Sequence, residues 1–114
     1  MKYSFETIKN EINGRVHFSP RIIVEEPHSL LCDLTYVGGE HGGYEGVVNI
    51  IKNLRTLQNK DVYYWGSHII DIESDINNSK LTDIELINKW EIPTKCLIEL
   101  LENWKQFLEI NGFV

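Results

Sequence analysis

A glycine-rich segment, GGEHGGYEG at residues 38–46, is the first candidate for chemistry in the sequence. It lies between a strand-like and a helix-like pattern, and backbone N–H groups at a helix N-terminus can bind phosphate. The segment lacks the lysine and the serine or threonine of a P-loop, and it does not have the G-x-G-x-x-G spacing of a dinucleotide-binding loop. Glu40 and Glu45 would also place negative charge beside a bound phosphate. We therefore expect a turn in which glycine adopts positive φ, not a phosphate site.

Histidine is the second candidate. His41 follows Glu40 and could act with it as an acid–base pair, while His17, His41 and His68 could converge on a metal. No H-x-x-x-H spacing supports a helical metal site, and no serine lies in a nucleophile elbow. We expect no catalytic residue, no cofactor and no metal. A small hydrolase or ligand-binding site would require these histidines and the glycine-rich segment to meet in one pocket.

The chain has two cysteines, Cys32 and Cys96, which lie far apart in the sequence. Each falls in an apolar pattern, so we expect two small buried side chains. One pair of cysteines cannot complete a zinc site, and a disulfide is not expected in a cytosolic chain.

Acidic residues are concentrated in the second half of the chain. Residues 1–60 hold seven acids and seven bases, whereas residues 61–114 hold ten acids and four bases and carry the whole net charge of −6. Six of these acids lie within 21 residues: Asp71, Glu73, Asp75, Asp83, Glu85 and Glu91. They lack the glycine and the closing glutamate of an EF-hand loop, so calcium is not expected. Such a surface repels nucleic acid and anionic membranes and attracts basic partners, although acids also serve simply to keep a protein in solution.

Periodic patterns predict the α+β fold that positions these residues. Apolar residues at helical spacing predict two main helices, at about residues 44–58 and 94–110. Alternating patterns predict strands drawn from residues 2–8, 15–19 (broken by Ser19 and Pro20, with 22–24 as a continuation), 30–37, 62–65, 68–75 and 81–87. We expect one domain, residues 1–114, in which a four- to five-stranded, mostly antiparallel sheet packs with the two helices.

The second helix has the clearest pattern. Its apolar residues form one stripe about 100° wide, made of Leu97, Leu100, Leu101, Trp104, Phe107 and Leu108. Thr94 is expected to cap the N-terminus of this helix, and Asn111 with Gly112 is expected to end it.

The acids of the second half are expected to lie on strands. Asp71, Glu73 and Asp75 share one side of the strand at 68–75, and Asp83 and Glu85 share one side of the strand at 81–87. If the two strands pair antiparallel, the two acidic rows lie side by side. Like charges in that arrangement repel, and a cationic partner would relieve the repulsion.

Three consecutive aromatic residues, Tyr63, Tyr64 and Trp65, precede the first acidic strand. A strand must send Tyr64 to the opposite side from its two neighbours, so one side is expected to be core and the other exposed, unless a helix covers it. Aromatic anchors surrounded by charge are typical of protein interfaces. The predicted contact surface consists of Tyr64, Trp65, Asp71, Glu73, Asp75, Asp83 and Glu85.

Two further patterns bear on location and assembly. No run of about 20 apolar residues suits a membrane span, and residues 1–10 lack the apolar core of a signal peptide. We therefore expect a cytoplasmic protein without a membrane partner. An unpaired edge strand leaves open whether the chain is a monomer or a weak dimer.

The segment WEIPTKCLIELLENWKQFLE, Trp90 to Glu109, follows the acidic strands. Together with them, over residues 68–110, it resembles small bacterial immunity proteins of polymorphic-toxin and contact-dependent growth inhibition systems. The resemblance implies a cytoplasmic protein that binds the C-terminal toxin domain of a cognate effector, and many such toxins are nucleases with basic clefts. Its matching residues are packing positions, so the resemblance assigns no contact residue.

Our leading hypothesis is an immunity protein, not an enzyme, that neutralises a basic toxin domain of the RNase type through an acidic surface. One alternative is the small hydrolase or ligand-binding domain described above. Another is an acidic regulatory subunit of a basic protein, which would use the same surface.

Overall fold

The strands of the chain form two separate antiparallel sheets, of two and four strands, in the part that our computed structural model describes: residues 1–26, 28–37, 43–67, 69–83, 85 and 88–114. The elements are, in order, β1 (Tyr3–Ile12), β2 (Arg15–Val24), the 3-10 helix η1 (Ser29–Tyr36), α1 (Gly43–Arg55), β3 (Tyr63–Gly66), β4 (Ile70–Ser74), β5 (Asn78–Asp83), β6 (Lys89–Pro93) and α2 (Thr94–Ile110). The α+β prediction is confirmed, and so are the two main helices, although α1 ends three residues early.

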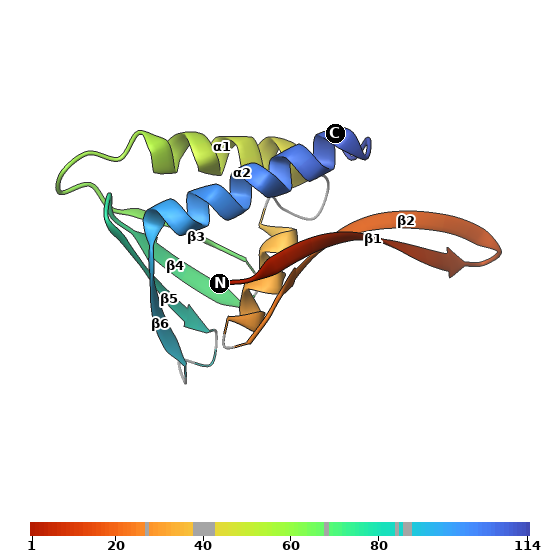
Figure 1. The fold of residues 1–114 in the computed structure, drawn as a ribbon, viewed down its shortest axis with the longest axis horizontal. Coiled ribbons are helices and arrows are strands. Elements are labelled where there is room, and N and C mark those ends of the chain that lie inside the picture. The colour runs from red at the N-terminus through yellow and green to blue at the C-terminus, as the bar shows by residue number, and fades with distance from the viewer. Residues whose placement is uncertain (27, 38–42, 68, 84, 86–87) are drawn as a thin grey trace.

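The core lies between the β3–β6 sheet and the helices. In Figure 1, α1 and α2 lie side by side over one face of this sheet. Strand alternation sends Ile70 and Ile72 of β4 towards the helices, and both side chains are buried. The helical stripes meet them from the other side with Val47, Ile50, Ile51 and Leu54 of α1 and Leu97, Leu100, Leu101, Trp104 and Leu108 of α2. In the described part of the chain, no helix covers the other face of the sheet (Figure 1).

A hydroxyl-lined contact fixes the start of α2. Thr94 does not cap the helix as predicted, because it is the first helical residue, is buried, and follows Pro93 in the N-cap position. Its Oγ1 instead donates to the carbonyl oxygen of Asp75 at 2.8 Å and shares a hydrogen bond with Oγ of Ser79. The predicted helix end is confirmed: Asn111 is the C-cap, and Gly112 follows with φ of 75°.

The strand predicted at residues 30–37 is wrong, because this segment is the helix η1. Leu31 and Leu34 are its buried residues, and their spacing of three matches the three residues per turn of a 3-10 helix. A hydrogen bond joins the segment to β2: Oγ1 of Thr35 accepts the N–H of Ile22 at 2.9 Å. Within this helix Cys32 is exposed, in contrast to the predicted burial. Cys96 is half-buried.

Strands β1 and β2 form a continuous hairpin that extends beyond the rest of the molecule (Figure 1). Asn13 and Gly14 form its two-residue turn, both with positive φ (52° and 76°), as a type I′ turn requires. The predicted break at Pro20 does not occur. The N–H of Ile22 points away from β1 towards Thr35, and Pro20, two residues earlier, presents its nitrogen to the same side. Proline therefore removes no hydrogen bond between β1 and β2.

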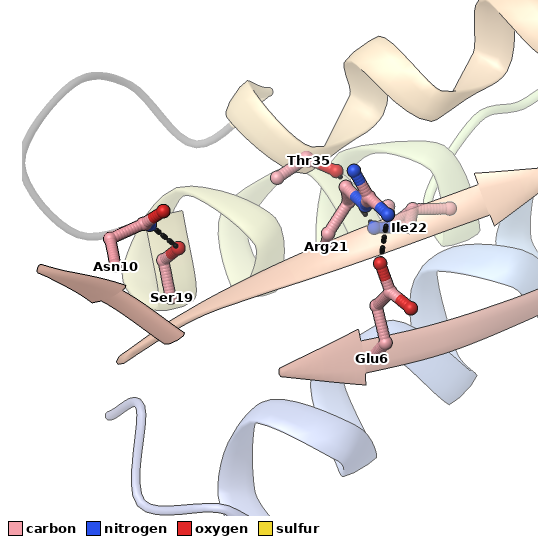
Figure 2. A network of polar contacts seen from close by, with 6 residues as sticks. All are labelled: Glu6, Asn10, Ser19, Arg21, Ile22 and Thr35. Carbon is pink, nitrogen blue, oxygen red and sulfur yellow. Dashed lines mark hydrogen bonds and ion pairs between the residues drawn. The ribbon is translucent and has the colours of Figure 1, made fainter. Parts of the chain in front are cut away.

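The base of the hairpin packs on α2, and its tip is exposed. The Phe5 ring lies 5.4 Å from the rings of both Trp104 and Phe107. Side-chain contacts between the two strands, from Arg21 to Glu6 and from Asn10 to Ser19, lie on the opposite face (Figure 2). Residues 9–18 are all exposed.

No helix within the described ranges combines the length and the apolar character needed to span a membrane.

Candidate functional site

The free face of the β3–β6 sheet carries a regular array of polar side chains. In the antiparallel register, Tyr64 lies opposite Glu73, Glu73 opposite Lys80, and Lys80 opposite Glu91. A second row places Asp71 beside Thr82, followed by Lys89. We call these side chains the outer face: Tyr64, Asp71, Glu73, Lys80, Thr82, Lys89 and Glu91.

The outer face is an open hollow of about 650 Å³. Tyr64 stands at one side of it and is 72% exposed. The Tyr64 hydroxyl donates to Oε1 of Glu73 at 3.3 Å, and Nδ2 of Asn78 donates to Oε2 of Glu91 at 3.0 Å on the far side. A large aromatic side chain that is exposed and held at the rim of a hollow can act as an anchor for a partner.

The charges of the outer face alternate in sign. Its three carboxylates and two lysines give a net charge of −1. Within the described ranges, no side-chain hydrogen bond and no ion pair within 4.0 Å engages the charged groups of Asp71, Lys80 or Lys89, so these charges are available to a partner. The outer face is thus suited to recognise a pattern of charges, and not merely a positive potential.

Three of the seven predicted contact residues lie on the outer face: Tyr64, Asp71 and Glu73. Trp65 does not, because strand alternation turns it towards the helices. Its Nε1 donates to Oγ of buried Ser74 at 3.0 Å. Trp65 is therefore a partly buried packing residue.

The predicted pair of acidic rows is not formed. Register places Lys80 opposite Glu73 and Thr82 opposite Asp71, so no acid of β5 faces the acids of β4. Asp83 lies opposite Ile70 on the helix-facing side and is only 9% exposed. Its Oδ2 accepts the backbone N–H of Asn88 at 3.2 Å and the Nδ2 of the same residue at 2.9 Å.

Glu85 is exposed in the connection between β5 and β6, outside any strand. It therefore does not share a strand face with Asp83, and it is not part of the outer face.

Asp75 shapes the turn between β4 and β5. Its Oδ1 accepts the backbone N–H groups of Asn77 at 2.8 Å and Asn78 at 2.7 Å. These two hydrogen bonds lower the pKa of the Asp75 carboxyl, because they stabilise its charged form. Asp75 has a structural role here that sequence reasoning missed.

Four residues of the outer face were missed: Lys80, Thr82, Lys89 and Glu91. Strand alternation carries the signal for two of them, since Leu81 is buried and its neighbours Lys80 and Thr82 must point outwards. The other two belong to β6, which was not predicted as a strand.

The histidines and the glycine-rich segment of the alternative hydrolase or ligand-binding site lie only partly within the described ranges. Residues 38–42 of the glycine-rich segment, including His41, lie outside them, as does His68. His17 is exposed on the hairpin and His28 is half-buried beside η1. Among the described residues, no group of three or more histidine, cysteine, aspartate or glutamate side chains is placed to hold a metal.

Comparison with known proteins gave no match to a family model, to a curated protein or to a solved structure. The residues that carry the resemblance to immunity proteins are mostly core residues of β6 and α2. Ile92, Leu97, Leu100 and Trp104 are all at most 5% exposed. They stabilise the layer that supports the outer face and do not belong to it.

Proposed function

We propose that this chain is an immunity protein that binds and neutralises a bacterial toxin domain in the cytoplasm. The observation that carries the proposal is the outer face: a hollow that none of the described elements covers, with an exposed tyrosine beside unpaired charges. The resemblance over residues 68–110 supports the choice of a toxin as the partner.

The outer face specifies the chemistry of that partner. Asp71, Glu73 and Glu91 would face arginine or lysine side chains, as in the basic cleft of a nuclease. Lys80, which lies between Glu73 and Glu91, would face an acidic side chain of the partner. In one nuclease–inhibitor complex, close charge pairs couple by about 1.5–7 kcal/mol, so a few matched pairs are enough for tight binding.

Alternating charge contributes more to specificity than to attraction. A toxin with the wrong pattern places a like charge against Lys80 or Glu73, and such a contact opposes binding. The net charge of −6 over the whole chain still favours a basic partner at long range and disfavours nucleic acid. A standard interface buries about 800 Å² on each partner. We therefore expect the contact to include residues at the edges of the sheet as well as the outer face.

An immunity gene is expected directly downstream of its toxin gene, so the experiment is co-expression of the chain with the C-terminal domain encoded by the gene upstream. We expect growth to be restored and a stable complex to be isolated from the same cells. Continued growth arrest, with the chain folded and abundant, would contradict the proposal. Restored growth without a complex would also contradict it, because the proposed mechanism is direct binding.

A further inference from the structure

The hairpin of β1 and β2 has one strand edge that is open for pairing. Among the described residues, β2 is the only strand beside β1. The two-residue turn makes Ile12 and Arg15 exchange both hydrogen bonds, so the residues between such pairs point their backbone groups outwards. On the exposed part of β1 these are Thr7, Lys9 and Glu11, and none is a proline.

The edge of β2 is not equivalent. Its N–H at Ile22 is already bound by Thr35, and Pro20 has no N–H to offer. Proline on a strand edge prevents pairing with another strand. The free pairing edge of the hairpin is therefore that of β1.

We propose that β1 pairs antiparallel with β1 of a second copy of this chain, in a register that places Lys9 opposite Glu11 of the second copy. By two-fold symmetry, Glu11 then lies opposite Lys9 of the second copy. Asn10 lies on the symmetry axis, and Ile8 lies opposite Ile12. The two hairpins become one four-stranded sheet.

Complementary side chains select this register. It forms two lysine–glutamate pairs on one face of the new sheet and two isoleucine pairs on the other. A shift by two residues in one direction places Lys9 opposite Lys9, and a shift in the other direction places Glu11 opposite Glu11. Like charges directly opposite are destabilising. A shift by one residue would turn the outward-pointing backbone groups away from each other.

The pairing also accounts for the exposed apolar side chain at the end of β1. Ile12 is 60% exposed in a single chain, and Ile8 is half-buried. In the pair, each Ile12 packs against an Ile8. Two short strand edges bury much less than roughly 1,200 Å², the lower end of the range for a standard interface, so the dimer is weak and dependent on concentration. The outer face of the β3–β6 sheet takes no part in it.

Charge reversal tests the dimer. Sedimentation equilibrium of the purified chain, up to about 1 mM, should show a monomer–dimer equilibrium. Lys9→Glu should weaken the dimer roughly tenfold or more, and Glu11→Lys should do the same, because each single change converts both pairs into like-charge contacts. The double variant K9E/E11K should restore the original affinity, since it exchanges the charges within each pair.

A disulfide tests the register. In a background where Cys32 and Cys96 are replaced by serine, Asn10→Cys should cross-link two copies on mild oxidation, because position 10 faces itself. Thr7→Cys is the matched control and should not cross-link, since the two copies of position 7 lie far apart.

Four results would overturn the proposal. The chain remains monomeric at every concentration; the dimer is indifferent to both single reversals; the double variant fails to recover; or Thr7→Cys cross-links in place of Asn10→Cys. If the chain remains monomeric and Lys9→Glu instead weakens binding of the toxin domain, the β1 edge belongs to the toxin interface and not to a second copy.

Discussion

Glu73 on β4 lies directly opposite Lys80 on β5, on the face of the sheet that points away from the helices. This pairing changes the character of the candidate surface, because a lysine stands where a second row of acids was expected. Tyr64 lies on the other side of Glu73 and donates a hydrogen bond to it. The surface is therefore defined by an aromatic residue and alternating charges, and not by acidity alone.

A buried chain of hydroxyl groups supports the sheet beneath this face. Oγ of Ser79 lies 2.6 Å from Oγ of Ser74 and 2.8 Å from Oγ1 of Thr94. Ser79→Ala removes two buried hydrogen bonds and leaves Ser74 Oγ and Thr94 Oγ1 with one partner each, so we expect the free energy of unfolding to fall by about 1–3 kcal/mol in urea denaturation. Thr82→Ala, on the outward side of the same strand, is the control and should change it by about 0.5 kcal/mol or less. Equal effects of the two substitutions would contradict a special role for the hydroxyl chain.

Asp75 should make stability depend on pH in the acid range. Its folded-state pKa is lowered by the N–H groups of Asn78 and Asn77. The stabilisation is therefore fully present above the unfolded pKa of about 3.9 and is lost as the pH falls through the lower folded pKa. Asp75→Asn keeps an oxygen acceptor but does not titrate, so unfolding measured between pH 7 and pH 2 should lose this component. An unchanged pH profile in the variant would exclude Asp75 as its source.

Two glycines should differ in their sensitivity to alanine. At Gly66 an added Cβ would collide with the backbone carbonyl of Ile70, whereas at Gly14 no heavy atom lies within 4 Å. We expect Gly14→Ala to lower the free energy of unfolding by about 1–2 kcal/mol, because only the left-handed backbone opposes it. Gly66→Ala should be more destabilising than Gly14→Ala in thermal or urea unfolding. The reverse order would contradict the close approach of β3 and β4 at this point.

The sequence correctly predicted those elements in which the spacing of apolar residues shows which side is buried. The stripe from Leu97 to Leu108 repeats at helical spacing and is buried as expected. The alternation of Ile70 and Ile72 with Asp71 and Glu73 identified the two faces of β4 correctly. Such patterns are local, so one segment is enough to read them.

Other features depend on contacts between distant segments and could not be predicted in this way. The segment from Leu30 to Tyr36 alternates like a strand, but it is a helix held by Thr35 against β2. The register that places Lys80 opposite Glu73 also depends on the pairing of β5 with β4, which neither strand reveals alone. By contrast, the type I′ turn at Asn13 and Gly14 has a local signal, the Asn-Gly dipeptide, that was missed.

The most direct test of the proposed function is the affinity for the proposed partner, the C-terminal domain encoded by the gene upstream, measured by titration calorimetry. Tyr64→Ala should weaken binding by roughly 30-fold, as expected for an aromatic anchor, and Glu73→Lys by at least about tenfold. Glu99→Lys is the matched control. It makes the same change in net charge at an exposed site on α2, away from the outer face, and should alter the affinity by no more than about twofold. If the toxin binds and Tyr64→Ala and Glu73→Lys have no larger effect than Glu99→Lys, the outer face is not the binding site.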